Sequence, residues 1–282
     1  MGTADNLTEP ATQQIRQLLA QASCARLDAE ALLAHVLCLP RSALIAHSEQ
    51  TVAPEVLRRY RALLARRMNG EPLAYLVGER EFWSLPLAVT PMVLIPRPET
   101  ELLVERALAL LPDVAGGTRV ADLGTGSGAI ALALARARPR WQLLASDVSA
   151  SALQVARANA RSLGLDQIEF VAGDWFAPLA KRRFHAIVSN PPYVADGDPA
   201  LHALRYEPAL ALSPGASGLE ALQHLIAGAA PHLEPGAWLL LEHGAQQGRD
   251  VAATLVAAGY ARVRCHRDLA GHERVTEAQW QQ

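Results

Sequence analysis

The spacing of apolar residues changes along the chain, and in its first part it indicates helices. From residue 8 to about residue 70, apolar residues recur three or four positions apart, as on the buried face of a helix. Asp28 is expected to cap one of these helices, and Pro54 is expected to begin the last one, which ends before Gly70. The stretch predicts a small helical domain at residues 1–78. Its expected inward faces contain Ile15, Leu18 and Leu19, then Leu32, Leu33, Val36 and Leu37, and then Val56, Leu57, Tyr60, Leu63 and Leu64.

Between residues 79 and 96 the apolar residues follow the period of two that is typical of strands. The alternation continues around Pro86 and Pro91 and ends in the apolar run at residues 93–95. Because proline is tolerated at sheet edges and not in central strands, we expect a separate β-hairpin here. The hairpin would link the helical domain to a larger domain at residues 97–282.

From residue 119 onward, short apolar runs alternate with helical patterns. Such alternation predicts an α/β fold in which helices cover both faces of a mostly parallel, doubly wound sheet. The last stretch, residues 261–280, instead predicts a hairpin that turns at Gly271. The expected strands are 120–123, 143–147, 168–173, 186–189 and 238–242, and the expected helices are 129–137, 150–163, 219–230 and 247–258.

The composition narrows the class of protein without assigning a function. Of 282 residues, 50% are hydrophobic and 19% are charged, and the formal net charge is −2, a globular balance with no basic excess for nucleic acid. No run of about 18 apolar residues is present, and the first residues lack the pattern of a secretory signal. Cys24, Cys38 and Cys265 lie far apart, with no histidines at metal-ligand spacing. We therefore expect reduced thiols, no metal, no membrane span and a cytoplasmic location.

Three glycines lie where the first expected parallel strand passes into a helix. Residues 122–128 read Asp-Leu-Gly-Thr-Gly-Ser-Gly, so a ligand can approach the backbone closely, and the helix N-terminus favours negative charge. Asp147 closes the next strand, where a carboxylate can bind both hydroxyls of a ribose. The two features together predict a nucleoside site.

The glycine spacing alone leaves the type of nucleoside open. Gly124, Gly126 and Ala129 also satisfy the dinucleotide pattern G-x-G-x-x-G/A. Two details favour S-adenosylmethionine. The third glycine, Gly128, lies one residue earlier than the dinucleotide pattern requires, and Asp122 can position the amino group of a methionine moiety.

Asp174 and Trp175 end the third expected strand, where they can contact an adenine. Asp174 can accept a hydrogen bond from the adenine amine, and Trp175 can stack on the ring. A half-buried tryptophan that only packs would give the same pattern.

The segment Asn190-Pro191-Pro192-Tyr193 follows the fourth expected strand. The two prolines stiffen the backbone and remove two donors, so the turn presents acceptors. The Asn190 side-chain oxygen and the Pro191 carbonyl can accept both hydrogens of one planar NH₂ group, and Tyr193 can pack against the group that carries it. The pattern indicates an amide or aromatic amine as nucleophile, although a proline turn that caps a strand shares it. Residues expected at the cofactor are Asp122, Gly124, Thr125, Gly126, Ser127, Gly128, Asp147, Asp174, Trp175 and Asn190.

In this order, these segments resemble the protein-glutamine methyltransferases that modify peptide-chain release factors. The resemblance covers nearly the whole chain and is weakest in the first 70 residues. Ser127 stands where the family often has threonine, which keeps a hydroxyl in place. The further matching segments are 72–75, 78, 81–82, 94–101, 206–208, 241–244, 268–271 and 274.

The resemblance implies a Rossmann-like class I methyltransferase domain that uses S-adenosylmethionine. The implied reaction methylates the side-chain amide nitrogen of the glutamine in a release factor's Gly-Gly-Gln motif. By the same resemblance, residues 124–128, Asp147, Trp175 and Asn190 would contact the cofactor, and residues 190–193 would hold the glutamine. The helical N-terminal domain would dock the release factor.

Three other functions share parts of this pattern. A closely similar enzyme could modify a glutamine in a ribosomal protein. An adenine amino methyltransferase that acts on nucleic acid would use the same two acceptors, but it should have a basic groove and stacking platforms. A non-catalytic module that binds a nucleoside and a protein would have no need for paired acceptors. The histidines need no catalytic role, and we expect His243 to be structural.

Overall fold

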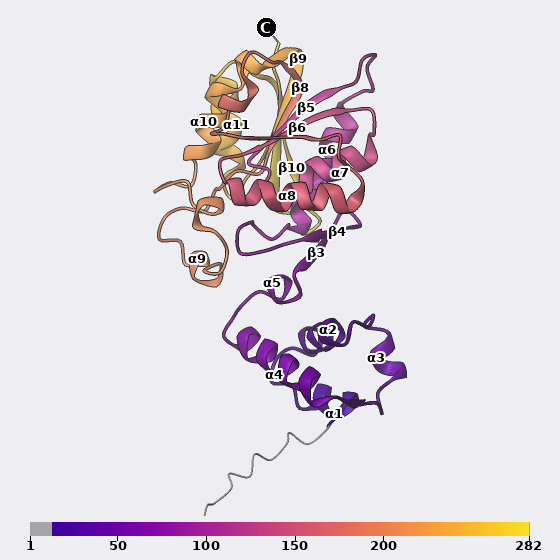
Figure 1. Ribbon diagram of the computed structural model, residues 1–282. Helices are drawn as coiled ribbons and strands as arrows, with labels where there is room; N and C mark the ends of the chain where they lie inside the picture. Colours follow the sequence, from indigo (N-terminus) through magenta and orange to yellow (C-terminus); the bar gives the residue numbers. More distant parts are fainter. Residues whose placement is uncertain (1–12, 282) are drawn as a thin grey trace, which may run out of the picture. The chain divides into compact units, whose positions relative to one another are not determined.

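The computed structural model describes residues 13–281 and divides into two units, Met1–Gly78 and Glu79–Gln282 (Figure 1). The start of the helical stretch that we expected from residue 8 lies outside the described residues. In the described part of the first unit, helices surround one apolar core, as the spacing of apolar residues predicts. Its elements are β1 (Gln13–Gln14), α1 (Ile15–Ala20), α2 (Arg26–Leu37), α3 (Ala43–Ala46), β2 (Thr51–Val52), α4 (Pro54–Met68) and α5 (Leu73–Val77).

The expected cap at Asp28 was wrong. Helix α2 begins two residues earlier, at Arg26, and the Ala25 carbonyl accepts hydrogen bonds from the amides of Asp28 and Ala29. Asp28 therefore lies in the first helical turn, where its Oδ2 accepts a hydrogen bond of 2.7 Å from Arg67 Nε of α4. The carboxylate joins two helices of the bundle instead of capping one.

The predicted hairpin is shorter than the pattern suggested. Strands β3 (Glu79–Phe82) and β4 (Leu85–Ala88) pair antiparallel around a two-residue turn, Trp83 and Ser84, with positive φ at both. The expected continuation through residues 93–95 was wrong, because this run forms no strand. Ile95 instead donates its backbone N–H to Glu207 Oε2 at 3.0 Å, so a side chain takes the place of a strand partner.

The second unit alternates strands with helices, which confirms the predicted α/β fold. Helices α7 and α8 have the predicted bounds, and the terminal hairpin turns at Gly271. The elements are η1 (Pro98–Thr100), α6 (Glu101–Leu110), β5 (Arg119–Leu123), α7 (Ala129–Ala137), β6 (Gln142–Asp147), α8 (Ala150–Leu163), β7 (Glu169–Ala172), η2 (Ala177–Leu179), β8 (Phe184–Ser189), α9 (Ala200–Ala203), η3 (Ala209–Ala211), α10 (Glu220–Gly228), η4 (Ala230–His232), β9 (Leu233–Glu242), α11 (Gly248–Ala257), β10 (Ala261–Arg267) and β11 (Glu273–Gln279).

The central sheet has seven strands in the order β10-β11-β9-β8-β5-β6-β7. The neighbours from β9 to β7 pair parallel, whereas β11 pairs antiparallel with both β9 and β10. From β5 the chain continues to β6 and β7 on one side, and then returns to β8 on the other. The strand order therefore reverses between β5 and β8, and ligands of such sheets bind at this switch point, beyond the carboxyl ends of the strands.

Apolar cores lie on both faces of this sheet. Successive strand residues contribute to opposite faces, as Val120 and Ala121 of β5 do. Figure 1 shows α6 and α7 beside one face and α10 and α11 beside the other. Within residues 13–281, no helix has the length and apolar character that a membrane span requires. The two cores hold the strand ends at fixed positions, which is what a site built from strand ends needs.

Candidate active site

A cavity of about 630 Å³ opens beyond the carboxyl ends of β5 to β8. The glycine turn follows β5, Asp147 ends β6, and Asn190 follows β8, so the fold brings the separate motifs to one edge of the sheet. The lining residues that the sequence singled out are Gly124, Thr125, Gly126, Ser127, Asp147, Asp174, Trp175, Asn190 and Pro192; Asp122, Gly128, Pro191 and Tyr193 do not line it.

The glycine turn is fastened to the end of β6. The amides of Gly124 and Thr125 both donate to the Ser146 carbonyl at 2.9 Å, and the Gly126 amide donates to Asp147 Oδ2 at 2.9 Å. Gly126 has a φ of +56°, a conformation that favours glycine. The turn is thus held open toward the cavity, and no side chain projects from Gly124 or Gly126.

Asp147 is both part of the cavity wall and a brace for the turn. Besides the Gly126 amide at Oδ2, it accepts the Ser149 amide at Oδ1, 2.8 Å away. Burial raises the pKa of this carboxyl, against the opposing effect of these backbone donors. Each carboxylate oxygen can accept further hydrogen bonds, so the side chain can still bind a diol in the cavity.

Asp122 lies beneath the glycine turn and does not line the cavity. It is 1% exposed, and its Oδ2 accepts hydrogen bonds from Thr125 Oγ1 at 2.6 Å and from the Ala131 amide at 3.3 Å. Its Oδ1 is buried without a partner, and burial raises the pKa of the carboxyl to about 7. The contacts present support the turn, and the predicted contact between Asp122 and the amino group of the cofactor stays a prediction.

Gly128 serves the packing of helices. It has a φ of +86°, and a Cβ atom there would lie 3.0 Å from Leu132 Cδ1 and 3.2 Å from the Cβ of Ala156. The start of α7 therefore packs closely against α8 at position 128. Its role differs from that of Gly126, where an added Cβ would meet no atom within 4 Å.

We expect Gly128→Ala to lower the free energy of unfolding by about 1–3 kcal/mol, because it adds both backbone strain and overpacking. Gly126→Ala adds strain without a clash, so it should cost less stability and weaken ligand binding more, since its methyl group enters the cavity. Urea unfolding and calorimetric titration of both variants with S-adenosylmethionine measure the two effects. Equal stability losses would contradict the packing role of Gly128.

The far end of the cavity is formed by aromatic and acidic side chains after β7. Trp175 has a φ of +37°, which is rare for a bulky residue, and a Cβ atom on Gly124 would lie 3.7 Å from its ring. The His224 ring of α10 lies 6.2 Å from the Trp175 ring, centroid to centroid. Asp174 is exposed beside them. No sequence motif indicates His224, because α10 reaches this wall only through the fold of the sheet.

The Asn190 turn faces the cavity from the β8 side. Asn190 Nδ2 donates to Thr100 Oγ1 at 3.2 Å, and Pro192 lines the wall beside it. Pro191 is buried. Ser189, the last residue of β8, donates its hydroxyl to the Leu123 carbonyl of β5 at 2.6 Å, which ties the two strand ends together. The Asn190 turn and the glycine turn therefore share one rigid base.

Tyr193 has a different contact from the one predicted. Its hydroxyl hydrogen-bonds to the Glu242 carboxyl, and burial raises its pKa. Its carbonyl accepts from Gln247 Nε2 at 3.1 Å, and the same amide group donates to the Gly218 carbonyl at 3.1 Å. These contacts hold the turn from behind, and the predicted contact between Tyr193 and a substrate stays a prediction.

An ion pair holds the wall opposite the glycine turn. Arg97 lines the cavity and its Nη2 donates to Glu207 Oε1, while Glu207 Oε2 accepts the Ile95 amide. Glu207 is 7% exposed whereas the Arg97 side chain is 29% exposed, so the carboxylate is shielded from water and the guanidinium is only partly shielded. It joins the segment before α6 to Pro208, which also lines the cavity.

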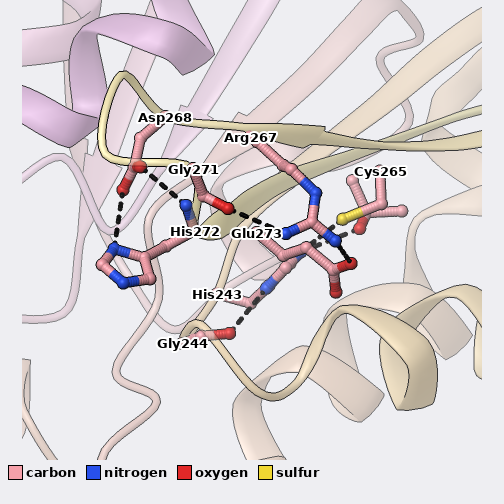
Figure 2. Close-up of polar contacts among 9 residues, drawn as sticks. His243, Gly244, Cys265, Arg267, Asp268, Gly271, His272 and Glu273 are labelled. Atoms are coloured by element: carbon pink, nitrogen blue, oxygen red, sulfur yellow. Dashed lines mark hydrogen bonds and ion pairs between the residues drawn. The ribbon is translucent and has the colours of Figure 1, made fainter.

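His243 is structural, as expected (Figure 2). Its Nδ1 lies 3.0 Å from the Gly244 carbonyl, which can only accept, so Nδ1 carries the proton. Nε2 then accepts from Thr276 Oγ1 at 2.8 Å, with Cys265 Sγ 3.8 Å away. Burial lowers the pKa of the ring. The neutral imidazole has partners at both nitrogens and is not among the cavity residues.

Comparisons with known proteins agree with this geometry. The family described as the PrmC N-terminal domain matches residues 10–78, and the family described as the methyltransferase small domain matches residues 99–252. The second match alone spans more than half of the chain.

Curated relatives cover almost the whole chain. The release factor glutamine methyltransferase of Xylella fastidiosa is 50% identical over 253 residues, which are 89% of this chain and 92% of the relative. That of Coxiella burnetii is 46% identical over 95% of this chain and 97% of its own. That of Escherichia coli is 46% identical over 96% and 97%.

Solved structures share the fold at low identity. A methyltransferase from Pyrococcus furiosus has a TM-score of 0.53 at 19% identity and covers 77% of this chain and 98% of its own. A 16S rRNA methyltransferase of T. thermophilus, in complex with AdoMet and guanosine, has a TM-score of 0.54 at 20% identity over 72% of this chain and 50% of its own. At such identities they show the fold alone.

Proposed function

We propose that this chain, which belongs to the release factor glutamine methyltransferase family, methylates the glutamine of the Gly-Gly-Gln motif in peptide-chain release factors. The methyl donor would be S-adenosylmethionine, and the acceptor the side-chain amide nitrogen. The observation that supports this most is that one cavity is lined by both the glycine turn with Asp147 and the Asn190 turn. A nucleoside and a small planar amide can thus be bound side by side.

The residues present suit S-adenosylmethionine, which supplies a methyl group activated by a sulfonium. Because Gly124 and Gly126 have no side chains, the cofactor can approach the backbone of the turn closely. Asp147 offers acceptors to a ribose diol. Trp175 offers a ring face and Asp174 an acceptor at the far end of the cavity. Asp122 would act from beneath the turn, where it accepts hydrogen bonds from Thr125 and from the Ala131 amide.

The Asn190 turn would orient the nucleophile. An amide nitrogen is a weak nucleophile because its lone pair is delocalised into the carbonyl. Asn190 Oδ1 and the Pro191 carbonyl would accept its two hydrogens, which aligns the nitrogen with the methyl group and favours a more pyramidal nitrogen as the new bond forms. The carbon–nitrogen bond forms as the carbon–sulfur bond breaks, and the nitrogen then loses one proton to water. The products are N5-methylglutamine and S-adenosylhomocysteine.

The first unit would bind the release factor outside its glutamine loop. Leu27, Ile45 and Met68 are apolar side chains of this unit that are more than half exposed. Such residues are suited to a protein partner. We place the reaction in the cytoplasm, where release factors act and where Cys24 and Cys265 would stay reduced, as free cysteines.

Peptide mass mapping tests the substrate. Purified protein is incubated with S-adenosylmethionine and a release factor, and in parallel with ribosomal proteins and with nucleic acid. We expect a mass gain of one methyl group on the Gly-Gly-Gln peptide, and none when that glutamine is replaced by glutamate. Methylation of a ribosomal protein or of nucleic acid, with an unmodified Gly-Gly-Gln peptide, would contradict the proposal.

A further inference from the structure

A buried carboxyl lies behind the Asn190 turn. Glu242 is the last residue of β9 and is 1% exposed. Ser189 and Leu241 are register partners on the adjacent parallel strands β8 and β9. Asn190 directly follows Ser189, and Glu242 directly follows Leu241. Burial destabilises its ionised form, and hydrogen bonding by the Thr100 and Tyr193 hydroxyls opposes the resulting rise of its pKa, while its Oε2 has no hydrogen-bond partner. A buried carboxyl is costly, and nothing in the nucleoside site explains this one.

Burial raises the pKa of Glu242 to about 7, and above that pH, where the carboxylate form prevails, the hydrogen bonds around it have only one consistent direction. A carboxylate can only accept, so the Thr100 hydroxyl must donate its hydrogen to Glu242. The Thr100 oxygen then has only lone pairs to offer Asn190, so it faces the amide nitrogen, Nδ2, at 3.2 Å. Because the side-chain amide is planar, Oδ1 is the atom left to accept from a ligand. Thr100 is 4% exposed and itself lines the cavity.

We propose that Glu242 is a positioning residue that acts through Thr100 to fix the orientation of the Asn190 side-chain amide. Without the carboxylate, the Thr100 hydroxyl could rotate and donate to Asn190 Oδ1. The two amide orientations would then be similar in energy, and one of them would present a donor, NH₂, to the substrate's NH₂. Tyr193 holds the same carboxyl from the other end of the turn. The catalytic part of this inference rests on the proposed role of Asn190 as acceptor for the glutamine amide.

Kinetics of isosteric variants test the catalytic part. We expect Thr100→Val to lower kcat about 10- to 100-fold and Glu242→Gln about tenfold, because each loosens the orientation of the nucleophile. Thr100→Ser keeps the hydroxyl and should retain most of the activity. The double variant should be no slower than Thr100→Val alone, since both substitutions break one chain of contacts. The calorimetric Kd for S-adenosylmethionine should stay near that of the wild type.

Glu277→Gln is the matched control. Glu277 is also 1% exposed in the same sheet, but its carboxyl pairs with Arg106 and not with the Asn190 turn. We expect it to lower the melting temperature while leaving kcat near the wild-type value. If Glu277→Gln and Glu242→Gln lowered kcat equally, or if Thr100→Val kept full kcat, the positioning role would be overturned.

The side-chain NH₂ signal of Asn190 tests the orientation without any turnover. The signal is assigned by its loss in Asn190→Asp, and in the wild type we expect one NH₂ proton to be shifted and protected from exchange by Thr100. In Thr100→Val and Glu242→Gln this protection should be lost. Unchanged signals in both variants would overturn the inference. If the signals change as expected while the wild type methylates no release factor, the orientation stands and the proposed substrate fails.

Discussion

Replacement of Asn190 by alanine is expected to lower kcat for glutamine methylation by about 10²–10³-fold, the usual cost of removing one preorganised hydrogen-bonding group from a reaction centre. The side chain lines the cavity beside Thr100, and in the proposed mechanism it contributes one of the two acceptors for the substrate amide. The Kd for S-adenosylmethionine should change little, because the glycine turn and Asp147 stay intact. Single-turnover kinetics and calorimetric titration separate the two quantities.

Asn190→Asp provides the control for this result. Its carboxylate keeps acceptor oxygens but cannot donate to Thr100, so it should be impaired by loss of orientation and not by loss of acceptors. We expect kcat between those of the wild type and Asn190→Ala. If Asn190→Ala kept the wild-type kcat, the role of the turn would be only structural, as a cap at the end of β8.

Much of the fold could be predicted because local patterns determine it. In α7 and α8 the helical period and the flanking residues fix both ends, so the predicted and observed bounds coincide. The parallel strands follow from short apolar runs between helices. The strand predicted at residues 93–95 was wrong because an apolar run also occurs in a buried loop. The amide of Ile95 is satisfied there by the side chain of Glu207. A side-chain partner more than a hundred positions away leaves no local trace.

In the candidate site, too, residues in local motifs could be predicted from the sequence, and residues brought together by the fold could not. Residues that line the cavity from a local turn, such as Gly126 and Asn190, could be found by their sequence motifs. Their supports could not: Thr100 precedes Asn190 by 90 positions, and Gln247 and Glu242 reach the turn only because β9 lies next to β8. Supporting residues are identified by strand order and not by spacing. The helix contact at Gly128 likewise depends on the fold, because Ala156 of α8 lies close to it, and the predicted cofactor contact of Gly128 stays a prediction.

Replacement of Asp147 by alanine is expected to weaken S-adenosylmethionine binding by about 10²–10⁴-fold, which corresponds to two charge-assisted hydrogen bonds of roughly 1.5–3 kcal/mol each. The carboxylate also braces the Gly126 and Ser149 amides, so its loss loosens the turn that borders the cavity. Calorimetric titration measures the change. Asp174→Ala, which removes an exposed carboxylate from the same cavity, should have a much smaller effect.

The pH dependence of binding distinguishes the ribose contact of Asp147 from a purely structural role. Burial raises the pKa of this carboxyl in the free protein, and donors from a bound ribose diol would stabilise its ionised form. Below that raised pKa, binding must release a proton, so the affinity should increase as the pH rises toward it and level off above it. Asp147→Asn cannot ionise and should show no such rise. If wild type and Asp147→Asn gave parallel profiles, the carboxylate would not be the group that binds the ribose.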